Sequence, residues 1–82
     1  MKVYVVKELV GDWDDPVVSS LLGCYYKLDQ AERETKKFAI ENYKVYPEIV
    51  GFSIALMSVL EEGTQEVYCS IYKHIDELVR DE

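Results

Sequence analysis

The sequence has little of what most catalytic and phosphate-binding sites require. Its 82 residues include one histidine, His74, two cysteines and four glycines. No serine stands in a nucleophile-elbow context, and no glycine-rich phosphate loop is present. A serine or cysteine nucleophile would have to recruit the single histidine as its base. The sequence therefore predicts a protein that is not an enzyme and that uses no cofactor.

Basic residues are also scarce. Nine lysines and arginines stand against 16 aspartates and glutamates, which gives a net charge of −7. Because phosphate backbones and anionic headgroups need clustered cations, this balance argues against direct nucleic-acid binding and against membrane surfaces. The seven tyrosines therefore indicate core and interface packing, with a pocket for a small nucleotide-like ligand as the alternative. A partner protein with a basic surface fits the charge.

Long apolar runs are missing too. No stretch approaches the roughly 20 residues that span a bilayer, and Met1 leads directly into a strand-like segment without a secretion signal. Cys24 and Cys69 lack metal-ligand spacing and are expected to be reduced thiols in the cytoplasm. Residues 1–82 are expected to form a single domain with a small core, which favours a homodimer.

The clearest periodicity lies in residues 28–43. Apolar and small residues recur there at steps of three and four, which predicts a helix with one buried face. Asp29 and Glu32 have the spacing of a capping box, so the helix is expected to begin at about Gln30. Pro47 prevents its continuation. The buried face comprises Leu28, Ala31, Thr35, Phe38, Ala39 and Asn42.

Three segments are predicted to form strands. Residues 2–10 and 17–26 are rich in β-branched and aromatic residues, and the turn-forming segment GDWDDP at 11–16 joins them as a hairpin. Residues 49–60 alternate between large and small apolar side chains, which favours a central strand covered on both faces. A buried helix over 47–62 remains the alternative for this segment.

The C-terminal segment has a helical pattern. Seven apolar residues between Val67 and Val79 fall within an arc of roughly 140° at helical spacing. Thr64 precedes them as a candidate cap, so a second helix over 65–80 is expected, with His74 on its polar side. The predicted fold is α+β, a small antiparallel β-sheet with two helices in the order ββαβα.

Three segments also resemble a known family. VYVV, LLGCYYKLDQAERE and YPEIVGFSI are similar to small bacterial and phage ββαβ domains of unknown function, over roughly residues 3–60. Lys27 departs from the capping serine or threonine expected there. The resemblance implies the strand and helix order and brings no activity. The matching positions are Leu22, Gly23, Tyr25, Ala31, Gly51, Phe52 and Ile54.

The segment GDWDDP is the most distinctive polar stretch. Its aspartates lack the full ligand spacing of a calcium loop, so a solvated turn or a protein-binding tip is expected rather than a metal site. The predicted function is a non-enzymatic, acidic protein-binding module, and its specific form is a phage or mobile-element inhibitor that occupies a basic, nucleic-acid-binding surface of a host protein. The alternatives are a small-ligand or nucleotide-binding module and a housekeeping homo-oligomer. The expected partner-binding residues are Asp12, Trp13, Asp14, Asp15, Glu61, Glu62, Asp76 and Glu77.

Overall fold

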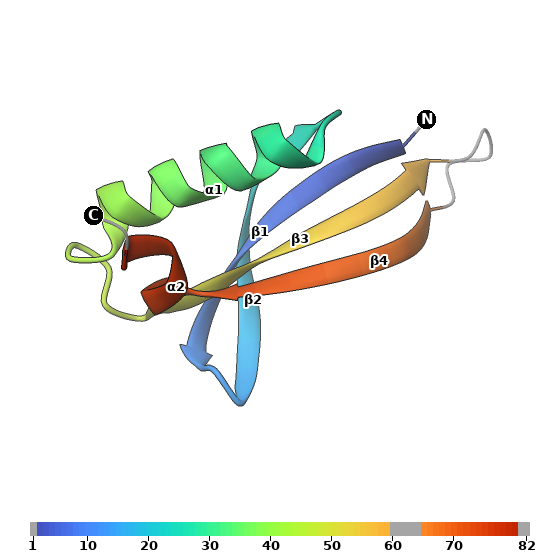
Figure 1. Ribbon diagram of the computed structural model, residues 1–82. Helices are drawn as coiled ribbons and strands as arrows, with labels where there is room; N and C mark the ends of the chain where they lie inside the picture. Colours follow the sequence, from blue (N-terminus) through green and yellow to red (C-terminus); the bar gives the residue numbers. More distant parts are fainter. Residues whose placement is uncertain (1, 60–64, 81–82) are drawn as a thin grey trace.

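Four antiparallel strands form one sheet, and two helices pack on one side of it (Figure 1). The structure is a computed structural model and describes residues 2–59 and 65–80. The strand order is β2-β1-β3-β4, so β2 and β4 are the edges. The predicted α+β class is confirmed, while the element order is ββαββα. The elements are β1 (Lys2–Asp12), β2 (Asp15–Tyr25), α1 (Leu28–Asn42), β3 (Ile49–Val59), β4 (Gln65–His74) and α2 (Ile75–Val79).

The predicted helix over 65–80 is wrong for most of its length. Gln65–His74 is a strand paired with β3, and only Ile75–Val79 is helical. The ladder contains an irregularity here: Met57 pairs with Val67 and Leu56 with Cys69, so Tyr68 is an extra residue in β4. This bulge shifts the alternation by one position, which brings the apolar spacing close to a helical period. Pairing with β3 also suits the β-branched and aromatic residues of the segment.

The strand prediction for residues 49–60 is confirmed over Ile49–Val59, and the alternative of a buried helix is wrong. The large residues Phe52 and Ile54 are 0% and 1% exposed. The small residues Gly51, Ser53 and Ala55 alternate with them along the strand and lie on the opposite face of the sheet.

Helix α1 is confirmed, with a different start. It begins at Leu28 after Lys27, which makes no side-chain cap, so the predicted cap at Asp29 and start at Gln30 are wrong. Asp29 instead lies in the first turn, where its charge suits the helix dipole. The buried face includes Ala31, Thr35 and Ala39, and the Thr35 hydroxyl donates to the Ala31 carbonyl at 2.7 Å.

The two faces of the sheet differ in what covers them. Val6 pairs with Ile54, and both pack with Ala31 of α1, which defines the helix face. The second core cluster on this face joins Phe52 and Ile49 to Leu78 of α2. Neighbouring positions, such as the Leu9–Gly51 pair, must point to the other side. We call that side the open face, because none of the described helices covers it (Figure 1).

The hairpin turn is shorter than predicted. The expected loop over 11–16 reduces to Trp13 and Asp14, because Gly11 pairs with Pro16 and Asp12 with Asp15. Gly11 has a φ of +96°, a conformation that glycine adopts without a Cβ clash. The Asp14 N–H donates to Oδ1 of Asp12 at 3.0 Å, which fixes the turn locally.

The two cysteines are free and exposed on opposite edges of the sheet. Three strand spacings, about 14 Å, separate edge strands in a four-stranded sheet, twice the Cα separation that a disulfide tolerates. The sheet order therefore excludes a bond between Cys24 and Cys69 within one chain. In the described part of the chain, no helix has the length and hydrophobicity needed to cross a membrane.

Candidate protein-binding surface

The open face exposes large apolar side chains. Side chains of directly paired residues point to the same face, so the partners of Leu9, Lys7 and Ser53 lie on it as well. These partners are Val18, Leu21 and Tyr72, and each of the three is more than half exposed.

A groove of about 520 Å³ crosses this face. Leu9 is almost fully buried, whereas Val18 and Tyr72, which line the same groove, are open to solvent. The groove is therefore concave, accessible and mostly apolar, as binding sites for side chains of a partner usually are. Its lining consists of Leu9, Trp13, Pro16, Val18 and Tyr72.

Trp13 lies back on the open face rather than extending from the turn. An ideal Cβ built on Gly51 would lie 2.6 Å from Cζ3 of Trp13, so the indole occupies the space that a side chain at position 51 would need. The indole also meets the His74 ring edge to face, with the ring centroids 4.9 Å apart. Trp13 is consequently half-buried and held in place, with part of its surface in the groove.

His74 ends β4 instead of lying on a helix. Its Nδ1 accepts a hydrogen bond from the Asp76 N–H at 3.0 Å and so caps α2. Oδ2 of Asp76 lies 3.6 Å from the same nitrogen. Because Trp13 contacts His74, the structure brings the hairpin turn and the beginning of α2 to the same end of the sheet.

The predicted acidic residues fall into three groups. Asp12, Asp14 and Asp15 are exposed at the turn beside Trp13, and Asp76 is exposed with its Oδ2 near Nδ1 of His74. Glu77 lies at a different groove, described below. Glu61 and Glu62 lie outside the described residues. None of the four aspartates lines the groove of the open face, and by the alternation of the β1–β2 ladder Asp12 and Asp15 point to the side opposite Leu9, Pro16 and Val18. We call the four carboxylates of Asp12, Asp14, Asp15 and Asp76, which lie at this end of the sheet, the acidic rim.

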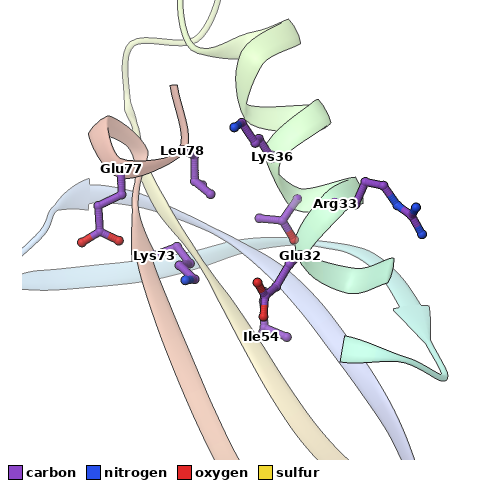
Figure 2. Close-up of a pocket in the computed structure, with 8 residues that line it drawn as sticks. Glu32, Arg33, Lys36, Ile54, Lys73, Glu77 and Leu78 are labelled. Atoms are coloured by element: carbon purple, nitrogen blue, oxygen red, sulfur yellow. The ribbon is translucent and has the colours of Figure 1, made fainter. Parts of the chain in front are cut away.

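A second groove, of about 420 Å³, lies between α1, β4 and α2 (Figure 2). Ile54 and Leu78 form apolar parts of its wall, while Glu77 and Lys73 bring opposite charges. In Figure 2 the Arg33 side chain extends away from Lys73, so the cations lining this groove do not converge on one point. The groove thus has no concentrated charge that would select an anionic or a cationic ligand.

Other candidate sites find little support in the arrangement of residues. Among residues 2–59 and 65–80, no group of three or more His, Cys, Asp and Glu side chains could hold a metal ion. The tyrosines are spread over several elements: Tyr4 pairs with Tyr25 across β1 and β2, Tyr46 follows α1, and Tyr72 is in β4. They do not form one stacking platform.

Sequence reasoning missed the apolar part of this surface. Val18, Leu21 and Leu9 were assigned only to predicted strands, and Tyr72 to the apolar arc of a predicted helix. The small residues Gly51, Ser53 and Ala55 could have indicated this surface, because small residues in a central strand leave room for large neighbours on the same face.

Comparison of the chain with models of protein families, with characterised proteins and with solved structures found no match. The resemblance to small bacterial and phage domains therefore rests on the quoted residues alone, and the functional argument on the geometry of the surface.

His74 provides a test of how this end of the sheet is held together. Replacing it with alanine should lower the free energy of unfolding by about 1 kcal/mol, the usual effect of losing an N-cap. His74→Asn should recover part of this loss, because an asparagine side chain can accept the same hydrogen bond. Urea denaturation followed by far-UV circular dichroism would measure both. Equal losses in the two variants would show that the contact with Trp13, not the cap, provides the stabilisation.

Proposed function

We propose that this chain is a non-enzymatic protein-binding module that docks its open face on a basic surface of another protein. The observation that carries the proposal is the exposure of Val18, Leu21 and Tyr72 on an open sheet face, at the edge of a groove. Exposed apolar patches of this kind mark interaction surfaces, since they cost free energy in water.

The acidic rim favours a basic partner. Asp12 and Asp15 lie directly opposite each other in the β1–β2 ladder, where like charges destabilise the pairing. Asp12 accepts the hydrogen bond from the Asp14 N–H that holds the turn, and binding to a cationic surface would offset the repulsion between the two carboxylates. Complementary charge would raise the association rate and select against acidic partners.

In its specific form, the proposal is that the chain occupies a nucleic-acid-binding surface of its partner and so inhibits it, in the cytoplasm. A chain of net charge −7 can compete with a phosphate backbone for the same cations. An origin in phages or mobile elements is supported by the resemblance of residues 3–60 alone.

The homodimer is the second candidate, and the same surface favours it. A second copy stacked on the open face would cover Val18, Leu21 and Tyr72, as in a two-sheet sandwich. Each copy carries a net charge of −7, so a dimer doubles the negative charge, whereas a basic partner neutralises it. For this reason we favour a basic partner over a second copy.

A substitution that removes apolar surface without changing charge tests the proposal. Leu21→Ser should weaken binding to the captured partner by about tenfold, the effect expected for a side chain near the centre of an interface. Val45→Ser is the matched control, because Val45 is equally exposed at 64% against 61% but lies in the loop after α1. Affinity capture from a bacterial lysate would identify the partner, and surface plasmon resonance with both variants would measure the change.

The outcomes separate the candidates. Capture of a nucleic-acid-binding protein that Leu21→Ser loses, that Val45→Ser retains and that added DNA or RNA displaces would support the proposal. Equal affinities for the two variants would contradict it. A wild-type sedimentation coefficient of a dimer, reduced to that of a monomer by Leu21→Ser, would assign the open face to a second copy instead.

A further inference from the structure

His74 connects two parts of the chain that are far apart in sequence. Its ring meets Trp13 of the hairpin turn, with the ring centroids 4.9 Å apart, and its Nδ1 accepts a hydrogen bond from the Asp76 N–H at 3.0 Å. The first contact holds one wall of the groove on the open face, and the second caps α2. Leu78 of α2 lies in turn in the buried cluster that contains Phe52. A change at His74 would therefore reach both the groove and the core.

The hydrogen bond from Asp76 requires one protonation state of His74. An imidazole nitrogen accepts a hydrogen bond only when it carries no proton, so the cap needs a neutral ring with its proton on Nε2. Histidine side chains ordinarily change charge between about pH 5 and 8. When Nδ1 takes up a proton from water, its N–H faces the backbone N–H of Asp76, and the cap is lost.

The carboxylate of the same aspartate is placed to form the replacement bond. Oδ2 of Asp76 lies 3.6 Å from Nδ1 of His74, so a small rotation of either side chain would let the protonated ring donate to it. The two side chains are 30% and 74% exposed, so they can rotate without disturbing the core. In the neutral state the backbone N–H of Asp76 donates to the ring, and in the protonated state the ring donates to the carboxylate.

We propose that His74 is a pH-sensitive switch between the hairpin turn and α2. Its neutral form caps α2, and its protonated form releases the cap, pairs with the Asp76 carboxylate and places a positive charge against the Trp13 ring. A charge within about 6 Å of an indole acts on its π electrons, so the contact with Trp13 changes at the same step. The switch is independent of the proposed function, and it makes one wall of the groove sensitive to pH.

Asp76 is the counterion that the strands and α2 provide for this switch. Among the described residues, no other carboxylate lies within ion-pair distance of the His74 ring. Lys73 and Glu77 line the groove on the helix side of the sheet (Figure 2), whereas His74 pairs with Gly51 on the open face. Gly51 has no side chain, so β3 brings no charge to the ring.

The hairpin turn carries two further carboxylates near Trp13. Asp12 accepts the hydrogen bond from the Asp14 N–H and points to the helix side of the sheet, and Asp14 is exposed. Because both are exposed and lie beyond ion-pair distance of His74, water and salt screen their effect on the ring. The protonated state of the switch therefore depends on Asp76.

The test follows the fluorescence of Trp13, the only tryptophan, in the full chain between about pH 5 and 8. The wild type should show one sigmoidal transition, because protonation places a charge against the indole. His74→Asn should show none, since asparagine can accept the Asp76 N–H throughout this range. Far-UV circular dichroism should stay constant in both proteins, which separates a change at the switch from unfolding.

Two variants of α2 that remove the same charge identify the acceptor. Asp76→Asn keeps the backbone N–H that caps α2 and removes the carboxylate that the protonated ring needs. Its transition should therefore move to lower pH by about 0.2–0.7 pH units, the effect of losing an exposed ion pair. Glu77→Gln is the matched control, because Glu77 is the next residue but lines the other groove, and its transition should stay close to that of the wild type.

Each of four results would overturn the inference. These are a wild-type fluorescence that does not change over this pH range, a transition that persists in His74→Asn, equal shifts in Asp76→Asn and Glu77→Gln, and a loss of circular dichroism signal that coincides with the fluorescence change. None of these results decides whether the open face is a docking surface, which Leu21→Ser tests separately.

Discussion

Replacing Phe52 with alanine should lower the free energy of unfolding by about 3–5 kcal/mol, the range measured for large aromatic residues in protein cores. Phe52 is completely buried, and its ring meets that of Phe38 edge to face, with the centroids 5.7 Å apart. It also joins three elements, because its cluster contains Ala39 of α1, Ile49 of β3 and Leu78 of α2. Natural domains are stable by only about 5–15 kcal/mol in total, so this variant should be close to unfolding at room temperature.

Chemical denaturation measures this loss, and two variants calibrate it. Phe52→Leu should lose much less stability, because it keeps most of the volume of the side chain. Val45→Ala, at an exposed loop position, should change the free energy of unfolding by less than about 0.5 kcal/mol. A similar midpoint for Phe52→Ala and Val45→Ala would show that α2 and α1 do not share a core over β3.

The parts of the fold that the sequence predicted correctly depend on short-range pattern. The buried face of α1 follows from the spacing of Ala31, Thr35 and Ala39, and the β3 alternation of large and small residues indicates a strand with two different faces. The α1 pattern is uninterrupted, and the β3 alternation is regular from Gly51 to Ala55, because the irregularity of the β1–β3 ladder lies before it, at Val50. The residue pattern within each segment was therefore sufficient to predict these two elements.

The errors arose where the chain departs from a regular period. In β4 the extra residue at Tyr68 shifts the alternation, and the remaining spacing of Val67, Ile71 and Tyr72 imitates a helix. Contacts across the sheet decide whether that segment pairs with β3. The periodicity of one segment carries no information about those contacts. The misassignment also moved His74 from the end of a strand to the side of a helix.

The candidate site was predictable in its charges and not in its shape. The acids at 12–15 stand out in the sequence, and the structure places all three on the surface beside Trp13. The groove depends on residues brought together by three strands and a turn: Leu9 in β1, Val18 in β2 and Tyr72 in β4. Their proximity follows from the strand order β2-β1-β3-β4, which one sequence does not specify.

Gly51 connects the stability of the sheet to the shape of the groove, and Gly51→Ala should damage both. A Cβ at this position would overlap the backbone carbonyl oxygen of Lys73 in β4 and would lie 2.6 Å from Cζ3 of Trp13. The first contact is with backbone, so β3 and β4 would have to separate locally. We expect a loss of about 3 kcal/mol, the upper part of the usual range for overpacked positions, because a paired strand cannot move aside as a side chain can.

The same substitution should displace the indole, and this gives a second measurement that stability alone would not predict. Under conditions where Gly51→Ala remains folded, Trp13 fluorescence should shift to longer wavelength, because the displaced indole is more exposed to water. Gly23→Ala is the matched control: its Cβ would approach only the Tyr25 side chain, with the hydroxyl oxygen 2.8 Å away, and that side chain can rotate. Gly23→Ala should therefore stay close to the wild type in stability and fluorescence. Equal behaviour of the two variants would mean that Trp13 is not seated on Gly51, and the groove on the open face would lose its Trp13 wall.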